Sequence, residues 1–248
     1  MSSVSVSVGA DVLLVLPAFN EQAALPGVIE QIRAVLPAAG ILVVDDGSSD
    51  GTADVASATG VRVLRLPFNL GVGGALRAGL LVGLREGWSV VVQCDADGQH
   101  PPASVPDLLA GLADADIVIG ARFAGSGDYQ VRGARSWAMV LLAHVMSRVH
   151  RTRLTDVTSG FRAFGQRAIE VLGRELPPDY LGDTVEALVI AKEYGLRVAQ
   201  VPVAMLPRQG GVASHRAFRA TLYLLRVMLI LVLSLLRLLG ARIRRRRR

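Results

Sequence analysis

The stretch SVVVQCDADGQHPP, residues 89–102, decides the fold class. It begins as an apolar run of strand length and ends as a cluster of acidic, amide and turn-forming residues. The same change occurs where VLLVL (12–16) leads to AFNE (18–21), and where ILVVD (41–45) leads to DDGSSDGT (45–52). In open parallel sheets, ligands bind beyond the carboxyl ends of the strands. The sequence therefore predicts a parallel sheet with a binding edge at these three polar clusters.

Amphipathic stretches and further apolar runs alternate outward from these segments. We expect helices over residues 21–36, 72–86, 107–113, 134–150 and 183–194. We expect further strands over residues 61–66, 115–121 and 196–203, and a loop over DVTSGFRAF (156–164). Asn20 has the residue type of an N-cap for the first helix. This alternation predicts an α/β fold whose mostly parallel sheet is flanked by helices.

The charge of the chain is divided unevenly. The 248 residues carry a formal net charge of +6. Residues 1–193 contain all 21 acidic residues and 15 of the 27 basic ones, and so carry −6, whereas residues 194–248 contain the other 12, all arginine. Because the folded body is acidic, we expect no nucleic-acid partner. The single cysteine, Cys94, excludes an intrachain disulfide and indicates a reducing compartment.

The pair Asp95 and Asp97 predicts a metal site. The two carboxylates stand one residue apart just beyond a buried strand. Mg²⁺ prefers oxygen ligands and is usually bound by one or two carboxylates plus substrate phosphates. Gln99 offers an amide oxygen beside them. The alternative is an Asx turn in which Gly98 takes the left-handed conformation.

Asp45 and Asp46 form a second acidic cluster at a strand end. Their carboxylates can accept hydrogen bonds from ribose hydroxyls or from the N–H of a base. The alternative is local turn chemistry, with Ser49 or Asp50 capping the next helix. GVGGAL (71–76) lacks the third glycine of a dinucleotide-binding loop, and we expect its glycines to allow close backbone packing.

These segments together resemble the family-2 glycosyltransferases of the GT-A fold. The matching segments are PAFNE (17–21), VVDDGSSDGT (43–52), Asn69 with GVGGALRAG (71–79), and CDADGQHPP (94–102). Four later segments resemble the branch of dolichyl-phosphate mannose synthase and the bacterial polyprenyl-phosphate glycosyltransferases: GARF (120–123), DVTSGFRAF (156–164), residues 183–203, and RQGGVASH (208–215). The resemblance covers about residues 11–215. The QxxRW motif of processive polysaccharide synthases is absent from the sequence.

The resemblance implies a role for particular residues. Those implied in donor binding are Pro17, Ala18, Asn20, Glu21, Asp45, Asp46, Asn69, Asp95, Ala96 and Asp97. Those implied in holding Mg²⁺ or Mn²⁺ on the donor diphosphate are Asp95, Asp97 and Gln99. Those implied at the acceptor phosphate are Arg122, Arg132, Arg135 and Ser136. Asp95, Asp97 and Arg122 are the expected catalytic residues. Arginine suits a phosphate because its planar fork pairs with two oxygens.

The implied reaction is the inverting transfer of a sugar from a nucleotide sugar, GDP-mannose or a UDP-hexose, to polyprenyl phosphate. No general base is required, because the acceptor phosphate is largely ionised at pH 7. The alternatives are a family-2 transferase with a glycolipid or cell-wall saccharide acceptor, and a non-catalytic membrane-bound module that binds nucleotide sugars or nucleic acid. His100 is expected to hold the loop rather than ligate the metal. Glu186 is either an acid near the acceptor or a polar position of its helix.

The tail predicts contact with a membrane. Residues 217–239 are long enough to span one, but Arg219, Arg226 and Arg237 return to one stripe at 100° per residue. An amphipathic helix of this kind lies in the membrane interface. A spanning helix would place Arg244–Arg248 outside the cell, against the positive-inside rule. We therefore expect a catalytic domain (1–213) and an interfacial tail (214–248).

The expected location is the cytosolic face of the cell membrane, with the terminal arginines on anionic lipids. The alternatives for the tail are a spanning helix and a helix packed against a partner membrane protein.

Overall fold

A computed structural model describes residues 9–122, 134–177 and 183–207. A seven-stranded sheet in the order β3-β2-β1-β4-β6-β5-β7 forms its centre. The strands are β1 (Val12–Ala18), β2 (Gly40–Asp45), β3 (Arg62–Arg65), β4 (Val90–Gln93), β5 (Ile117–Ala121), β6 (Arg162–Gly165) and β7 (Val198–Pro202). Only β6 runs antiparallel to its neighbours, β4 and β5. The sheet is therefore mostly parallel, as predicted.

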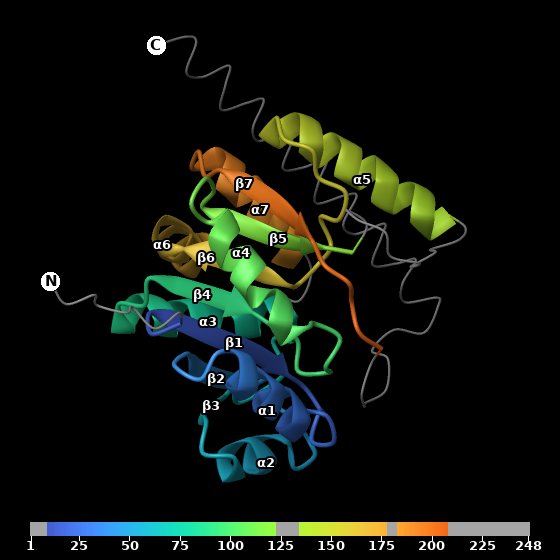
Figure 1. Cartoon of the computed structure of the whole chain (residues 1–248). Helices are drawn as coiled ribbons and strands as arrows, with labels where there is room; N and C mark the ends of the chain where they lie inside the picture. Colours follow the sequence, from blue (N-terminus) through green and yellow to red (C-terminus); the bar gives the residue numbers. More distant parts are fainter. Residues whose placement is uncertain (1–8, 123–133, 178–182, 208–248) are drawn as a thin grey trace, which may run out of the picture.

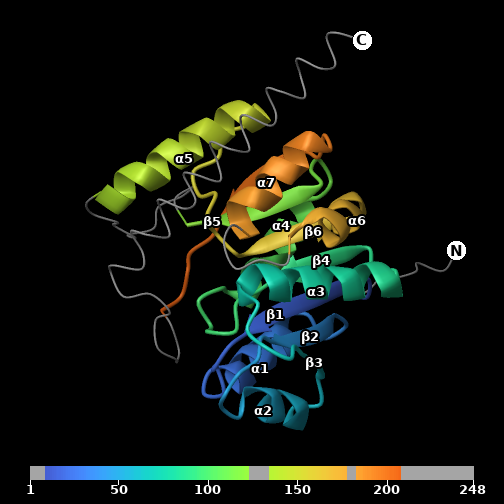
Figure 2. The ribbon, with the colours of Figure 1, turned by 180° about the vertical axis from the view of Figure 1, so that it is seen from behind.

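Helices cover both faces of the sheet (Figure 1). They are α1 (Leu25–Val35), α2 (Thr52–Ala58), α3 (Gly71–Glu86), α4 (Val105–Gly111), α5 (Ala134–His150), α6 (Gln166–Glu175) and α7 (Asp183–Glu193), with a short 3₁₀ turn, Pro102–Ser104, before α4. The helices α1, α2 and α4 lie on one face, and Figure 2 shows α3, α6 and α7 on the other. The strands β1, β2, β4 and β5 are buried between two apolar cores, which is why their sequences are largely apolar.

Glycines let α3 lie directly on the sheet. A Cβ at Gly79 would overlap the side chain of Val15 on β1, and a Cβ at Gly83 would stand 2.6 Å from Val91 on β4. These two glycines lie beyond the segment 71–76, whose own glycines Gly71, Gly73 and Gly74 are also buried.

Two of the local predictions are wrong. Asn20 is not the N-cap of the first helix, because α1 begins at Leu25 after Ala24. Asn20 instead has a φ of +57°, a left-handed conformation that asparagine tolerates, and its side chain bonds a neighbouring loop. The segment 156–164 is not wholly a loop, because β6 begins at Arg162 and α6 follows it. A strand of four residues is too short to show a period.

The predicted membrane tail (214–248), Arg132 and the RQGGVASH loop lie outside the described residues. Within the ranges that the structure describes, no helix has the length and apolar character needed to cross a membrane.

Candidate active site

The carboxyl ends of β1 and β2 carry two turns that are bonded to each other. Asn20 Oδ1 accepts a hydrogen bond from Ser49 N at 2.9 Å, and Asn20 N donates to Ser48 Oγ at 3.0 Å. Glu21 N donates to Thr52 Oγ1 at 2.9 Å. These contacts follow from the parallel register of the two strands. Pro17 and Ala18, the last two residues of β1, are buried and directly precede this cluster.

The acidic pair after β2 is held by backbone N–H groups. Asp46 accepts hydrogen bonds from Leu70 N at 2.7 Å and from Gly71 N at 2.8 Å, and thereby fixes the start of α3. Burial raises the pKa of Asp46, although the two backbone hydrogen bonds oppose the shift. Asp45 Oδ1 accepts a hydrogen bond from Ser48 N, three residues on, at 3.1 Å. Asn69 Oδ1 accepts from Gly71 N at 3.2 Å, which joins Asn69 to the same cluster.

Local turn chemistry therefore accounts for much of this cluster. Asp50 accepts a hydrogen bond from Thr52 N at 2.9 Å, although the N-cap of α2 is Gly51. Neither Ser49 nor Asp50 is the capping residue itself.

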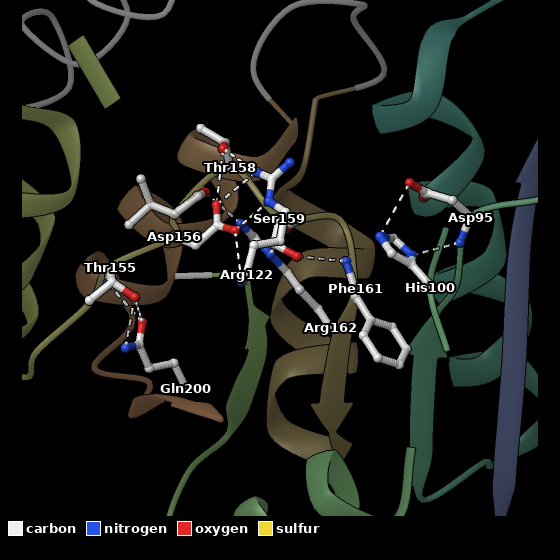
Figure 3. A network of polar contacts seen from close by, with 11 residues as sticks. Asp95, His100, Arg122, Thr155, Asp156, Thr158, Ser159, Phe161, Arg162 and Gln200 are labelled. Atoms are coloured by element: carbon white, nitrogen blue, oxygen red, sulfur yellow. Dashed lines mark hydrogen bonds and ion pairs between the residues drawn. The ribbon is translucent and has the colours of Figure 1, made fainter. Parts of the chain in front are cut away.

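The Asp95–Asp97 pair lies just beyond β4. The Asp95 side chain is 38% exposed, whereas Asp97 is buried and accepts a hydrogen bond from Gln99 N at 3.0 Å. Buried His100 accepts from Asp95 N through Nδ1 at 2.9 Å, and its Nε2 lies 3.4 Å from Asp95 Oδ2 (Figure 3). The imidazole also stacks on Phe161, with ring centroids 4.9 Å apart. His100 therefore holds the loop, as expected, and orients Asp95.

A second polar network follows β5. Arg122 forms a bidentate ion pair with buried Asp156, through Nε at 2.6 Å and through a terminal nitrogen at 2.9 Å (Figure 3). The same terminal nitrogen donates to Thr158 Oγ1 at 2.9 Å. Burial alone would raise the pKa of Asp156, but the hydrogen bonds and charge of Arg122 outweigh it and lower that pKa.

A buried arginine fixes the segment that carries Asp156. Arg162, 1% exposed, donates hydrogen bonds of 2.8 Å to the carbonyl oxygens of Val157, Ser159 and Thr184. On the other side of the segment, Thr155 N donates to the side chain of Gln200 on β7 at 2.8 Å. The segment is thus held by β6, β7 and the start of α7 together.

Comparison with known proteins agrees with this architecture. The model of the family described as "Glycosyl transferase family 2" matches residues 13–173. The chain belongs to glycosyl transferase family 2. This glycosyltransferase has the GT-A-type fold, and the resemblance seen in its motifs is confirmed.

Two relatives and one solved structure illustrate the likeness. The undecaprenyl-phosphate mannosyltransferase of Micrococcus luteus is 34% identical over 81% of this chain and 85% of its own length. The polyprenol monophosphomannose synthase of Mycolicibacterium smegmatis is 32% identical over 81% and 79%. Glucosyl-3-phosphoglycerate synthase from Mycobacterium tuberculosis, in complex with Mn²⁺, uridine diphosphate and phosphoglyceric acid, has a TM-score of 0.68 at 24% identity over 90% and 78%.

The oxygen ligands that the loop of Asp95 and Asp97 offers in this glycosyltransferase fit a metal ion that is also bound by a substrate. Among the described residues, no group of three His, Cys, Asp or Glu side chains is placed to hold an ion. Two carboxylates on one loop, one of them partly exposed, suit Mg²⁺ or Mn²⁺ that takes its other ligands from a diphosphate and water. The backbone of Gln99 is fixed, because its N–H bonds Asp97 and its carbonyl oxygen accepts from Leu206 N at 2.9 Å.

For the other residues predicted near the acceptor, the structure gives the position in a helix or none at all. Arg135 and Ser136 lie in the first turn of α5, and Arg132 precedes the described part of that helix. Glu186 lies in the first turn of α7, close in sequence to Thr184, whose carbonyl oxygen holds Arg162.

The sequence prediction missed Asp156, Thr158 and Arg162 as site residues. The quoted motif DVTSGFRAF contains all three, and its density of polar residues in a short segment was the available signal.

Proposed function

We propose that this glycosyltransferase moves a sugar from a nucleotide sugar to polyprenyl phosphate, and that the sugar is mannose. The names of the two relatives support the acceptor class and the sugar. The observation that carries the proposal is the meeting of two polar sites at one edge of the sheet. The Asp95 loop and the Asp156 segment contact each other through the stacked rings of His100 and Phe161 (Figure 3). One site suits a metal-bound diphosphate, and the other presents an arginine to a phosphate.

The residues of the donor side bind and orient the nucleotide sugar. Asp95, Asp97 and Gln99 would hold a divalent ion that the donor diphosphate also binds. Mg²⁺ or Mn²⁺ supplies neutralisation of the negative charge that develops on the leaving diphosphate. Asn20, Glu21 and Asp45 line the turns where the nucleoside lies, together with Pro17, Ala18, Asp46, Asn69 and Ala96. The ribose contact proposed for Asp46 adds to the backbone hydrogen bonds that its carboxylate already accepts.

The acceptor phosphate supplies its own nucleophile. A phosphate monoester with a second pKa near ~6 is largely ionised at pH 7, so an oxygen can attack the sugar carbon without a general base. Arg122 binds this phosphate and screens its repulsion from the donor, with Arg132 or Arg135 and Ser136 completing the site. The bidentate ion pair with Asp156 fixes the orientation of the Arg122 guanidinium before the substrate arrives.

The acceptor lipid places the enzyme at a membrane. We assign the contact to residues 214–248, which carry the arginine stripe and the five terminal arginines, at the cytosolic face where nucleotide sugars are found. Residues 1–213 form the catalytic domain in this proposal.

The test is a transfer assay with the full-length protein. Radiolabelled GDP-mannose, UDP-glucose and UDP-N-acetylglucosamine are each incubated with polyprenyl phosphate in detergent and Mg²⁺ or Mn²⁺. A labelled lipid that is lost on chelation supports the proposal. In parallel reactions that also contain a glycolipid or a cell-wall saccharide, label in that acceptor with polyprenyl phosphate left unused would move the enzyme to another acceptor class. Absence of labelled lipid with every donor would overturn the proposal.

A further inference from the structure

Gln93 carries a buried hydrogen-bond donor that the proposed reaction does not yet use. It is the last residue of β4 and is 1% exposed. Among the residues that the structure describes, its Nε2 has no hydrogen-bond partner. A buried donor without a partner is costly, and such a group in a native protein calls for a physical explanation.

The amide lies next to the carboxylate of Asp95. Gln93 ends β4, and Asp95 follows it by two positions, just beyond the strand. A Cβ added to Gly160 would stand 3.0 Å from Gln93 Nε2 and 3.3 Å from Asp95 Oδ1. Both groups therefore adjoin the position that a Cβ of Gly160 would occupy.

The two oxygens of Asp95 have different neighbours. Oδ2 lies 3.4 Å from Nε2 of His100, which Figure 3 shows beside the carboxylate. A Cβ on Gly160 would stand 3.3 Å from Oδ1 and 3.7 Å from Oδ2, so Oδ1 is the nearer of the two oxygens to that position, which the Gln93 amide also adjoins. One oxygen thus already has a donor in contact, and the other has a donor nearby.

Neither packing nor direct substrate contact explains the amide. Of the two residues opposite Gln93 in the sheet, Val15 on β1 is apolar and Arg162 on β6 carries only donors, so neither side chain can accept a hydrogen bond from the amide. The Nε2 atom is covered by protein, so a substrate group cannot reach it without displacing the Gly160 backbone. The Asp95 carboxylate is an acceptor that lies beside the same position of Gly160.

We propose that Gln93 is a positioning residue for Asp95. When the nucleotide and its divalent ion are bound, Nε2 of Gln93 donates a hydrogen bond to Oδ1 while His100 holds Oδ2, so both oxygens of the carboxylate are oriented. The inference rests on the proposed donor site and names a determinant of its metal affinity. Partners of this kind typically change metal affinity or activity by about 10–100-fold when they are removed.

The test is Gln93→Met, which keeps the length of the side chain and removes both polar atoms. Free Mn²⁺ is measured by electron paramagnetic resonance while the full-length protein is titrated in the presence of GDP or UDP, without any acceptor lipid. We expect Mn²⁺ binding about 10-fold weaker than in the wild type, with an unfolding temperature equal to or above that of the wild type. In the transfer assay, kcat falls while KM for the lipid is unchanged.

Gln200→Met is the matched control, because the Gln200 amide is satisfied by Thr155 and lies on β7. It should show the opposite pattern, a lowered unfolding temperature with unchanged Mn²⁺ affinity. Wild-type Mn²⁺ affinity in Gln93→Met, or a lowered unfolding temperature without a change in Mn²⁺ affinity, would overturn the inference. Because this titration contains no lipid, a failure of the proposed acceptor would leave its result unaffected.

Discussion

The donor side and the acceptor side of the site are held together by different forces. On the donor side, the acidic residues Asp45 and Asp46 accept hydrogen bonds from backbone N–H groups of the turns that follow β2 and β3. On the acceptor side, Asp156 is buried and paired with the Arg122 guanidinium. The donor side is thus built from turns on neighbouring parallel strands. The acceptor side depends on a buried charge that must be neutralised, so its stability is tied to one ion pair and to pH.

The largest expected effect falls on the donor side, in activity rather than in stability. Asp97→Asn keeps an acceptor for Gln99 N but removes the charge that the metal requires. Loss of one preorganised electrostatic group typically costs about 10²–10³ in kcat, so transfer should fall by at least about 100-fold with an unchanged unfolding temperature. The assay is transfer to polyprenyl phosphate at saturating metal.

Asp54→Asn is the control, because Asp54 is an exposed acid paired with Arg65 at the surface. It should leave transfer unchanged. Full activity of Asp97→Asn in the presence of a chelator would exclude a metal-dependent donor site.

The next effect falls on the acceptor side, in stability. Arg122→Met leaves the Asp156 carboxylate buried without its cation, which typically costs about 3 kcal/mol of unfolding free energy. The folded-state pKa of Asp156 is lowered, so the ion pair stabilises the protein above the ordinary carboxyl pKa and this contribution is lost as pH falls through the lowered value. The difference between wild type and variant should therefore be full at pH 7 and smaller at about pH 2.5, below the ordinary carboxyl pKa of 3.8, measured by urea unfolding.

The double variant Arg122→Met with Asp156→Asn removes both charges and should recover part of the loss at pH 7. A loss of stability that is the same at both pH values would mean that packing, not charge, holds the acceptor side.

A smaller effect concerns the attachment of α5 to the acceptor side. His150 donates through Nε2 to the carbonyl oxygen of Leu188 on α7, and burial lowers its pKa to about 4. Because the unfolded chain binds the proton more readily, stability is full above pH ~6.5 and declines toward pH 4, by about 2 kcal/mol once its partial exposure is considered. His150→Gln keeps a donor but does not titrate. Thermal unfolding between pH 7 and 4.5 should show a flatter dependence in this variant than in the wild type.

The smallest effect returns to the donor side. Gly47 has a φ of +70°, and a Cβ there would stand 2.8 Å from the backbone of Phe68. Gly60 has a φ of +77° with no atom within 4 Å of the corresponding position. Gly60→Ala should lower the free energy of unfolding by about 1 kcal/mol, through backbone strain alone. Gly47→Ala should lower it by about 1 kcal/mol more, because its Cβ also meets the Phe68 backbone. Equal costs in chemical denaturation would show that the 68–69 backbone moves freely away from the turn.

Much of the fold was predictable because its signals are local. The runs 12–16 and 41–45 and the pattern over 134–150 were each predicted as the element observed there, since apolar length and period identify buried strands and amphipathic helices. The antiparallel strand β6 was not predicted. Its four residues, RAFG, include a buried arginine, and its pairing partners β4 and β5 are distant in sequence.

The residues of the candidate site also divide into those that local sequence signals predict and those that they do not. The donor-side residues follow their strands directly, so knowing that β1, β2 and β4 are parallel neighbours places their clusters at one edge. On the acceptor side, Arg122 was predicted but its partner Asp156, 34 residues later, was not. Nothing in the local sequence pairs a particular arginine with a particular aspartate, because the pairing follows from the return of the chain through β6.

The sequence by itself determined the α/β class, the edge of the sheet at which the polar clusters gather, the Asp95–Asp97 pair and the separation of an acidic body from an arginine-rich tail, because each depends on residues close together in the chain. Only the tertiary structure decided that His100 and Gln93 adjoin Asp95 and that Arg122 is held by Asp156. It also decided that Arg162 fixes the segment that carries Asp156. These are contacts between buried polar groups. Their partners are selected by the geometry of the packed sheet, and that geometry exists only once the distant strands have paired.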